Sequence, residues 1–171
     1  MPVTQMAHAV VRQRPGNYHV VVSRRAATPV RFEYAVGDRL AAYVANHPGS
    51  SMSSTANRLV DEGLRMVEHP QIVFRDGPTG RRAGLIGGPD AWEIIRAVRS
   101  ARAAEPDLAE EEILALVETN SGVHPRLIRT AVRYWASYPA EIDAEIDAAT
   151  AAEDAAEEAW RRERQLLARE R

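Results

Sequence analysis

The chain has 171 residues and a formal net charge of −2, which is long enough for one domain or two small ones. It contains no cysteine, so disulfides and thiolate metal sites are excluded, and a reducing cytoplasm is the simplest expectation. No apolar run approaches the ~20 residues that cross a bilayer and no apolar signal-peptide segment is present, so we expect a soluble cytoplasmic protein with no membrane partner.

Charge is unevenly distributed along the chain. Residues 1–40 contain six arginines and two acidic residues, whereas residues 105–160 contain fourteen acidic residues and three arginines. A basic N-terminal part and an acidic C-terminal part suggest two kinds of partner.

Residues 1–27 show no sustained periodicity apart from a possible short strand at Tyr18–Val22, and Pro15-Gly16 marks a turn. We therefore expect a loose N-terminal arm. Its arginines can contact phosphate, and the alternative is a passive solvated end.

Residues 28–68 predict a strand followed by two helices. Val30–Val36 alternates apolar and polar residues, as a strand with one buried face does. Gly37-Asp38 is expected to end the strand, with Asp38 capping a short helix. The serines of residues 50–54 offer N-caps for a second helix, whose apolar residues recur at i, i+3, i+4 and i+7 until Pro70 stops it.

So small a unit cannot bury enough apolar surface alone, which favours an intertwined dimer. The stretch SMSSTANRLVDEGLR and its apolar positions resemble a ribbon-helix-helix domain. The resemblance implies that two strands, one per subunit, form a ribbon in the DNA major groove, with Phe32 and Tyr34 facing the core and Gly63 at the dimer interface. The implied DNA contacts are Arg31, Glu33, Ser51, Ser53 and Ser54. The alternative for the serines is that they only cap the helix.

Residues 69–140 predict a short β element and a helix-turn-helix. Ile72 and Phe74 favour a strand and Gly77–Gly80 a turn, followed by a helix whose core residues are Trp92, Ile94, Ile95 and Val98. Arg96, Arg99 and Arg102 give that helix a basic face, or simply a solvated one. GPTGRR is not a phosphate-binding P-loop, because the chain has no lysine.

The acidic helix around residues 108–118 is expected to stop at Asn120–Val123, and His124-Pro125 opens the next. On that second helix Ile128, Ala131, Val132 and Trp135 share one face, and Arg126, Arg129 and Arg133 share the opposite one. Two interpretations stay open: the arginines contact DNA, or they pair with the acidic run Glu110–Glu112 inside a compact bundle.

This block is similar to a helix-turn-helix family of unknown function that is classed with VapB-type antitoxins. The resemblance covers roughly 75 residues. It is carried by Gly77, Pro78, Gly80, Arg81, Arg82, Glu111, Glu112, Ile113, Arg129, Ala131, Tyr134, Glu141, Ile142 and Asp143.

Residues 141–171 predict one long helix, because they contain good helix formers and neither glycine nor proline. A narrow apolar stripe, typical of a helix that lies in another protein's groove, comprises Ile142, Ile146, Ala149, Ala156, Trp160 and Leu167. The alternative is a solvated, partly disordered tail.

The expected fold is mainly α: a ribbon-helix-helix dimer segment (28–68), a small helix-turn-helix domain with a short β element (69–140) and a long C-terminal helix (141–171). The resemblance implies an antitoxin that represses its own operator and neutralises a PIN-domain ribonuclease of the VapC type. It implies toxin contacts at Ile142, Ile146, Trp160, Arg161, Arg162, Arg164, Leu167 and Arg169.

Two rival hypotheses remain at this stage. A stand-alone dimeric transcription regulator would use the C-terminal helix only for self-association. An enzyme has little support, because the five histidines show no metal-ligand spacing and no Ser/His/Asp arrangement stands out. We therefore expect no catalytic activity, metal or cofactor.

Overall fold

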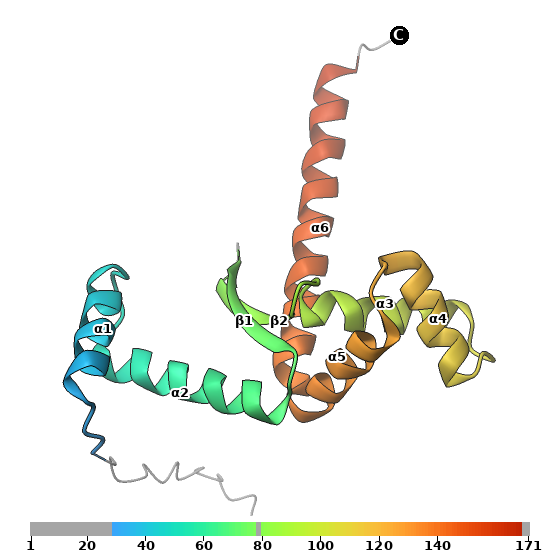
Figure 1. The fold of residues 1–171 in the computed structure, drawn as a ribbon. Helices are drawn as coiled ribbons and strands as arrows, with labels where there is room; N and C mark the ends of the chain where they lie inside the picture. The colour runs from blue at the N-terminus through green and yellow to red at the C-terminus, as the bar shows by residue number, and fades with distance from the viewer. Residues whose placement is uncertain (1–28, 78–79, 169–171) are drawn as a thin grey trace, which may run out of the picture.

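The structure is a computed structural model that describes residues 29–77 and 80–168. Within these ranges it is mainly helical, as expected, with one antiparallel β-hairpin (Figure 1). The elements are α1 (Tyr34–Ala45), α2 (Met52–Glu68), β1 (Ile72–Gly77), β2 (Gly80–Leu85), α3 (Ala91–Ala104), α4 (Glu110–Ser121), α5 (Pro125–Ser137) and α6 (Pro139–Leu167). The predicted arm 1–27, with its possible strand Tyr18–Val22, lies outside the described residues.

The structure contains no strand at the predicted position Val30–Val36: residues 30–33 have no regular secondary structure, and the residues from Tyr34 onward are helical. Helix α1 begins at Tyr34, and the N–H groups of Val36 and Gly37 both donate to the carbonyl of Glu33. Gly37 and Asp38 therefore lie inside the helix, and Asp38 does not cap it. The physical reason is that a lone strand leaves its backbone groups unpaired, whereas a helix pairs them within one segment.

Helix α2 begins and ends as predicted. Ser51 is its N-cap and forms a capping box with Ser54, in which each side chain bonds the other residue's backbone N–H at 3.0–3.1 Å. The helix ends at Glu68, before Pro70. Gln71 then has a φ of 85°, a left-handed conformation unusual for a side chain of this size, and the chain turns there into β1.

The strands β1 and β2 pair with Ile72 opposite Leu85 and Arg75 opposite Arg82. Ile72, Ala83 and Leu85 are buried and face the helices. Arg75 and Arg82 both reach Asp90, the N-cap of α3, at 2.6 and 2.9 Å. Asp90 therefore links the hairpin to α3 through two ion pairs.

Helices α3, α4 and α5 pack against one another, and a short turn at Gly122 to His124 joins α4 to α5. Gly122 ends α4 with a φ of 70°, which glycine adopts without steric cost. Pro125 occupies the first turn of α5, and the His124 ring accepts from the Arg126 N–H. The turn between α4 and α5 thus lies at the glycine and proline that the sequence offers for it.

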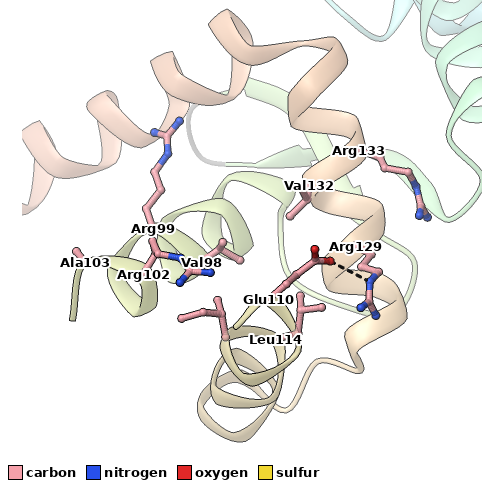
Figure 2. Close-up of a pocket in the computed structure, with 10 residues that line it drawn as sticks. Val98, Arg99, Arg102, Ala103, Glu110, Leu114, Arg129, Val132 and Arg133 are labelled. Atoms are coloured by element: carbon pink, nitrogen blue, oxygen red, sulfur yellow. Dashed lines mark ion pairs between the residues drawn. The ribbon is translucent and has the colours of Figure 1, made fainter. Parts of the chain in front are cut away.

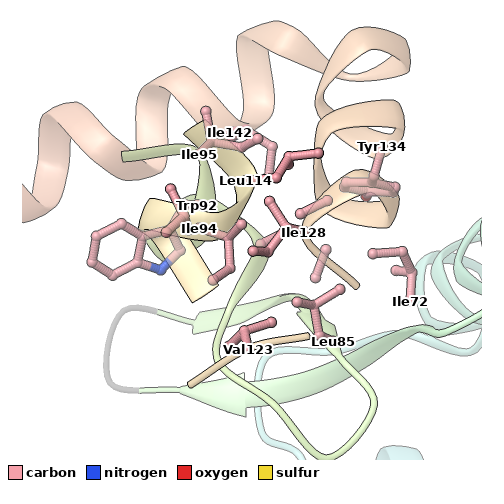
Figure 3. Packing of buried hydrophobic residues seen from close by; sticks show 14 of the residues in the cluster. Ile72, Leu85, Trp92, Ile94, Ile95, Leu114, Val123, Ile128, Tyr134 and Ile142 are labelled. Atoms are coloured by element: carbon pink, nitrogen blue, oxygen red, sulfur yellow. The ribbon is translucent and has the colours of Figure 1, made fainter. Parts of the chain in front are cut away.

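The hydrophobic core is formed by the hairpin, α3, α4, α5 and the first turns of α6 (Figure 3). Its largest fully buried side chains include Tyr134, Ile72, Leu85, Ile94, Ile128 and Ile142. Trp92, Ile94, Ile95, Ile128 and Ala131 are buried, as predicted. Val98, Val132 and Trp135 are partly buried against this core.

Figure 1 shows the two ends of the chain extending away from this core in different directions. Helices α1 and α2 form an arm on one side, and the outer part of α6 projects on another. Both ends carry residues that the sequence assigns to partners.

Candidate functional site

Helices α1 and α2 carry an exposed apolar surface. On α2, Val60, Leu64 and Val67 have 56%, 58% and 78% of their surface exposed. At about 100° per residue the apolar side chains of α2 form one stripe along the helix. We define the α1–α2 apolar face as this stripe and the segment before α1, comprising Val30, Phe32, Met52, Ala56, Leu59, Val60, Leu64 and Val67.

The opposite, polar side of α2 attaches the helix to the rest of the molecule. Glu62 is buried and accepts from the Arg81 Nε on β2 at 2.8 Å. Arg65 reaches Glu141 at the start of α6 at 2.5 Å and the Tyr134 hydroxyl at 3.0 Å. An amphipathic helix normally buries its apolar side, so the reversed arrangement leaves the apolar side for a partner.

The α1–α2 apolar face is hollowed by two grooves. They have volumes of about 390 and 370 Å³ and share Phe32, Ala56 and Val60 in their linings. The first also contains Leu40 and Leu59, and the second Val30 and Met52. Most of the lining side chains are aliphatic or aromatic, with Arg39 in the first groove and Ser53 and Asn57 in the second. Such grooves are suited to receive apolar side chains from another surface.

The Arg65 contact joins α2, α5 and α6. Tyr134 is buried and donates from its hydroxyl to Glu141 at 2.9 Å, while Arg65 also lies over the Tyr138 ring, 4.1 Å from its centroid. Burial alone lowers the pKa of Arg65, but its bonds with Glu141 and Tyr134 outweigh that effect and raise the pKa. Burial also raises the pKa of Tyr134, so the hydroxyl stays protonated and Arg65 stays charged.

The DNA-contact candidates at the front lie close to the α1–α2 apolar face. Arg31 and Glu33 are exposed and lie before α1. Phe32 is 39% exposed and Tyr34 93% exposed in the single chain, and their place in the core of a dimer stays a prediction. Ser51 and Ser54 cap α2, and Ser53 is exposed in the first turn. Capping and phosphate contact are compatible, because the capping box occupies only part of the helix N-terminus.

The arginines of α5 do not form one free basic ridge. Arg129 pairs with Glu111 and lies 3.7 Å from Glu110. For Arg129, the structure therefore agrees with the second interpretation, in which the arginines of α5 pair with the acidic run. Arg133 donates to the Thr130 hydroxyl at 3.2 Å, and Arg126 is exposed. The DNA-binding role of this helix stays a prediction, and the acidic neighbours of Arg129 oppose it.

A cleft of about 640 Å³ lies between α3, α4 and α5 (Figure 2). Ile113, Leu114, Val98 and Val132 form its apolar lining, with arginines around it. Arg99 extends toward α6, where it reaches Asp143 at 2.6 Å, and Arg133 points away from the cleft. Arg102 donates to the carbonyls of Pro106 and Leu108, so its guanidinium fastens the loop between α3 and α4.

The predicted toxin-binding residues divide into two groups. Ile142 is fully buried and Ile146 packs against the core, so the assignment of this pair to a partner surface is corrected. The first turns of α6 have an apolar side because that side completes the bundle. Farther out, Trp160 and Leu167 are 56% and 72% exposed, and Arg161, Arg162 and Arg164 are exposed as well. Arg169 lies outside the described residues.

Sequence reasoning missed the residues that attach α2. Arg65 and Glu62 lie one turn apart on a charged helix face, which predicts only a solvated surface. Their partners Arg81, Tyr134 and Glu141 all belong to the motif of the helix-turn-helix resemblance. The motif therefore identified these three partners, but their spacing along the chain could not show that they contact α2.

Among residues 29–77 and 80–168, no group of three or more histidine or acidic side chains is arranged to hold a metal ion. None of the helices described is both long and apolar enough to traverse a bilayer. In comparisons with known proteins, no family model, no curated protein and no solved structure matches this chain.

Proposed function

We propose that the protein is a dimeric antitoxin that binds operator DNA through its front segment and neutralises a PIN-domain ribonuclease through the outer part of α6. The observation that carries this proposal is the pair of exposed apolar surfaces at two separate ends of one chain. The first is the α1–α2 apolar face, and the second surrounds Trp160 and Leu167 on α6. Two such surfaces suit a protein with two partners.

A second copy of the chain is the partner that suits the α1–α2 apolar face. The stripe of apolar residues runs along α2, with Arg39 of α1 at one groove, and it belongs to a helix whose polar side already contacts β2, α5 and α6. A two-fold axis brings the same apolar residues of both copies together. Within residues 29–77 and 80–168, Val30 to Glu33 pair with no strand, so a second copy can supply one.

DNA contact follows from that dimer. The resemblance to ribbon-helix-helix proteins places the outward side chains of a two-stranded ribbon in the major groove, which here are Arg31 and Glu33. An arginine binds guanine O6 and N7, and a glutamate accepts from cytosine N4. The first turn of α2, with Ser51, Ser53 and Ser54, is positioned to approach the DNA backbone, as helix N-termini do.

The toxin contact is proposed for residues 155–168 of α6. This segment projects from the bundle with Trp160 and Leu167 exposed. The VapB-type resemblance implies a PIN-domain ribonuclease with an acidic active site, and a guanidinium binds carboxylates with two parallel hydrogen bonds. The arginines of this segment supply that chemistry.

Co-expression with the products of the neighbouring reading frames tests the proposal. We expect one of them to copurify with the full chain and to be lost when residues 155–171 are deleted. This deletion retains Ile142, Ile146 and Glu153, so the core and the Arg96–Glu153 pair are preserved. The matched control is the full chain with Asp147→Asn, an exposed position of α6 before the deleted segment.

A chain that binds its own promoter as a dimer, yet copurifies with neither neighbouring product, would instead be a stand-alone regulator. A deletion of residues 155–171 that leaves the complex intact would remove α6 from the proposal. The first result contradicts the antitoxin function, and the second contradicts only its assigned surface.

A further inference from the structure

The outer part of α6 carries three arginines within four residues, and their environments differ. Arg161 pairs with Glu157, and Arg162 lies 3.9 Å from Glu158, one helical turn earlier in each case. Arg164 has no carboxylate within 4.0 Å in residues 29–77 and 80–168. Its guanidinium carbon instead lies 5.3 Å from the centroid of the Trp160 ring.

Arg164 is also the arginine on the same side of the helix as the exposed apolar residues. It follows Trp160 by four positions and precedes Leu167 by three, the two spacings that bring side chains together on an α-helix. At about 100° per residue, Arg161 lies roughly a quarter turn away from Trp160 and Arg162 lies on the far side. We call Trp160, Arg164 and Leu167 the α6 tip patch.

We propose that Arg164, and not Arg161 or Arg162, is the arginine that enters the partner's carboxylate site, with Trp160 and Leu167 in apolar pockets beside it. This inference rests on the proposed function of α6. It specifies a partner surface with two apolar pockets bordering a cluster of carboxylates.

The three environments explain why one arginine is favoured. Arg161 and Arg162 each lie beside a glutamate that an approaching carboxylate must displace, although such exposed pairs are worth at most a factor of about five in affinity. Among residues 29–77 and 80–168, the guanidinium of Arg164 has no such counter-ion. Stacking on Trp160 also restricts the Arg164 side chain before binding, which lowers the entropy lost when the partner fixes it. An aromatic and an arginine side by side are the residue types that dominate binding energy at protein interfaces.

The test compares three matched substitutions in the full chain, Arg161→Gln, Arg162→Gln and Arg164→Gln, against the copurifying product of the neighbouring reading frame. Calorimetry should show Arg164→Gln weakening the complex by about 30-fold or more, and the other two by less than about threefold. Arg164→Lys should recover little of the loss, because an ammonium does not bind a carboxylate in the bidentate way. Circular dichroism should show the same helix content for all four variants.

The outcomes separate this inference from the proposed function. If deletion of residues 155–171 abolishes the complex while the three glutamine variants bind equally well, the role of Arg164 is wrong and the α6 interface stands. A larger loss with Arg161→Gln or Arg162→Gln also overturns the inference. If no neighbouring product binds the full chain, the proposed function and this inference fail together.

Discussion

Helices α2 and α6, with 17 and 29 residues, are the two longest of the helices that the structure describes, and their apolar sides have different surroundings. Helix α2 attaches through charged side chains, chiefly Arg65 and Glu62, and leaves its apolar side exposed. Helix α6 packs Ile142 and Ile146 into the core, beside the Arg99–Asp143 ion pair, and leaves a charged segment exposed. Apolar periodicity therefore corresponds to an exposed surface in α2 and to core packing in the first turns of α6.

The same comparison suggests two kinds of interface. The α1–α2 apolar face is long and has few charges beside it, as permanent homodimer interfaces do. The α6 tip patch places two apolar side chains among arginines and glutamates, so charge complementarity must contribute to its specificity. Four predictions test this difference, and each compares the two regions or the core between them.

The largest effect is expected for a carboxylate on the α1–α2 apolar face. Val60 lines both grooves, and Val60→Asp would place two carboxylates, one from each copy, in an apolar dimer interface. An unpaired buried charge costs several kcal/mol, so the dimer dissociation constant should rise by at least about 100-fold. Sedimentation velocity over a range of concentrations measures it. Trp160→Asp, on the other region, should leave self-association unchanged, and a monomeric wild-type chain would contradict the prediction.

The second prediction concerns the division of α6 into a core segment and an exposed segment. Ile142→Ala removes a fully buried side chain and should lower the free energy of unfolding by about 3 kcal/mol. Trp160→Ala removes a larger side chain that is 56% exposed and should change it by less than about 0.5 kcal/mol. Urea denaturation followed by circular dichroism measures both. Equal losses would mean that the outer segment also packs on the core.

The third prediction asks which region contacts DNA. Arg31→Gln should weaken binding to the protein's own promoter by about tenfold, because it removes a candidate base contact in each half of the dimer. Arg126→Gln, on the exposed side of α5, should have less than a threefold effect, since α5 adjoins the acidic run of α4. Fluorescence anisotropy at fixed salt measures both affinities. A larger loss with Arg126→Gln would transfer the DNA contact to the helix-turn-helix.

Much of the fold could be predicted from local sequence chemistry. Ser51 before α2, Gly122 after α4 and Pro125 at the start of α5 each fix a helix end by a backbone requirement that a few residues encode. The start of α1 was predicted wrongly, because the alternation of apolar and polar residues over Val30–Val36 cannot show whether a second strand is available to pair with this segment. A short segment without a partner forms helix from Tyr34 onward.

Less of the candidate site could be predicted, because contacts between residues far apart in the sequence determine which side chains are exposed. Ile142 and Trp160 belong to one stripe in the sequence, yet only the meeting of α6 with α3 and α5 separates a core residue from an exposed one. The unpaired state of Arg164 could have been predicted from spacing, since Arg161 and Arg162 each follow a glutamate by four residues and Arg164 follows Trp160. The Arg65–Tyr134–Glu141 contact, which orients α2, could not.

The smallest effect is expected where α6 meets the hairpin. Glu145 lies beside Arg81 and Arg82, and its Oε2 atom is buried with no hydrogen-bond partner among residues 29–77 and 80–168. Burial, with repulsion from Glu141, raises the pKa of Glu145 from its ordinary 4.5 to about 7, against the attraction of Arg82. The folded state therefore binds a proton more tightly than the unfolded state between about pH 4.5 and 7. The contribution of Glu145 to stability should fall as the pH rises through this window.

Glu145→Gln replaces this carboxyl with an amide that cannot ionise, so the variant should lose that part of the pH dependence. At pH 4 both proteins carry a neutral side chain at this position and should unfold at similar urea concentrations. At pH 8 the variant should be more stable by about 1 kcal/mol, well below the full pKa shift because the side chain is only partly buried. Glu157→Gln on the exposed part of α6 is the control and should leave the wild-type pH profile in place. A Glu145→Gln variant that is less stable than the wild type at pH 8 would mean that the ionised carboxylate is stabilised by Arg82, and the contact of α6 with the hairpin would then be an ion pair, like the Arg81–Glu62 contact of α2.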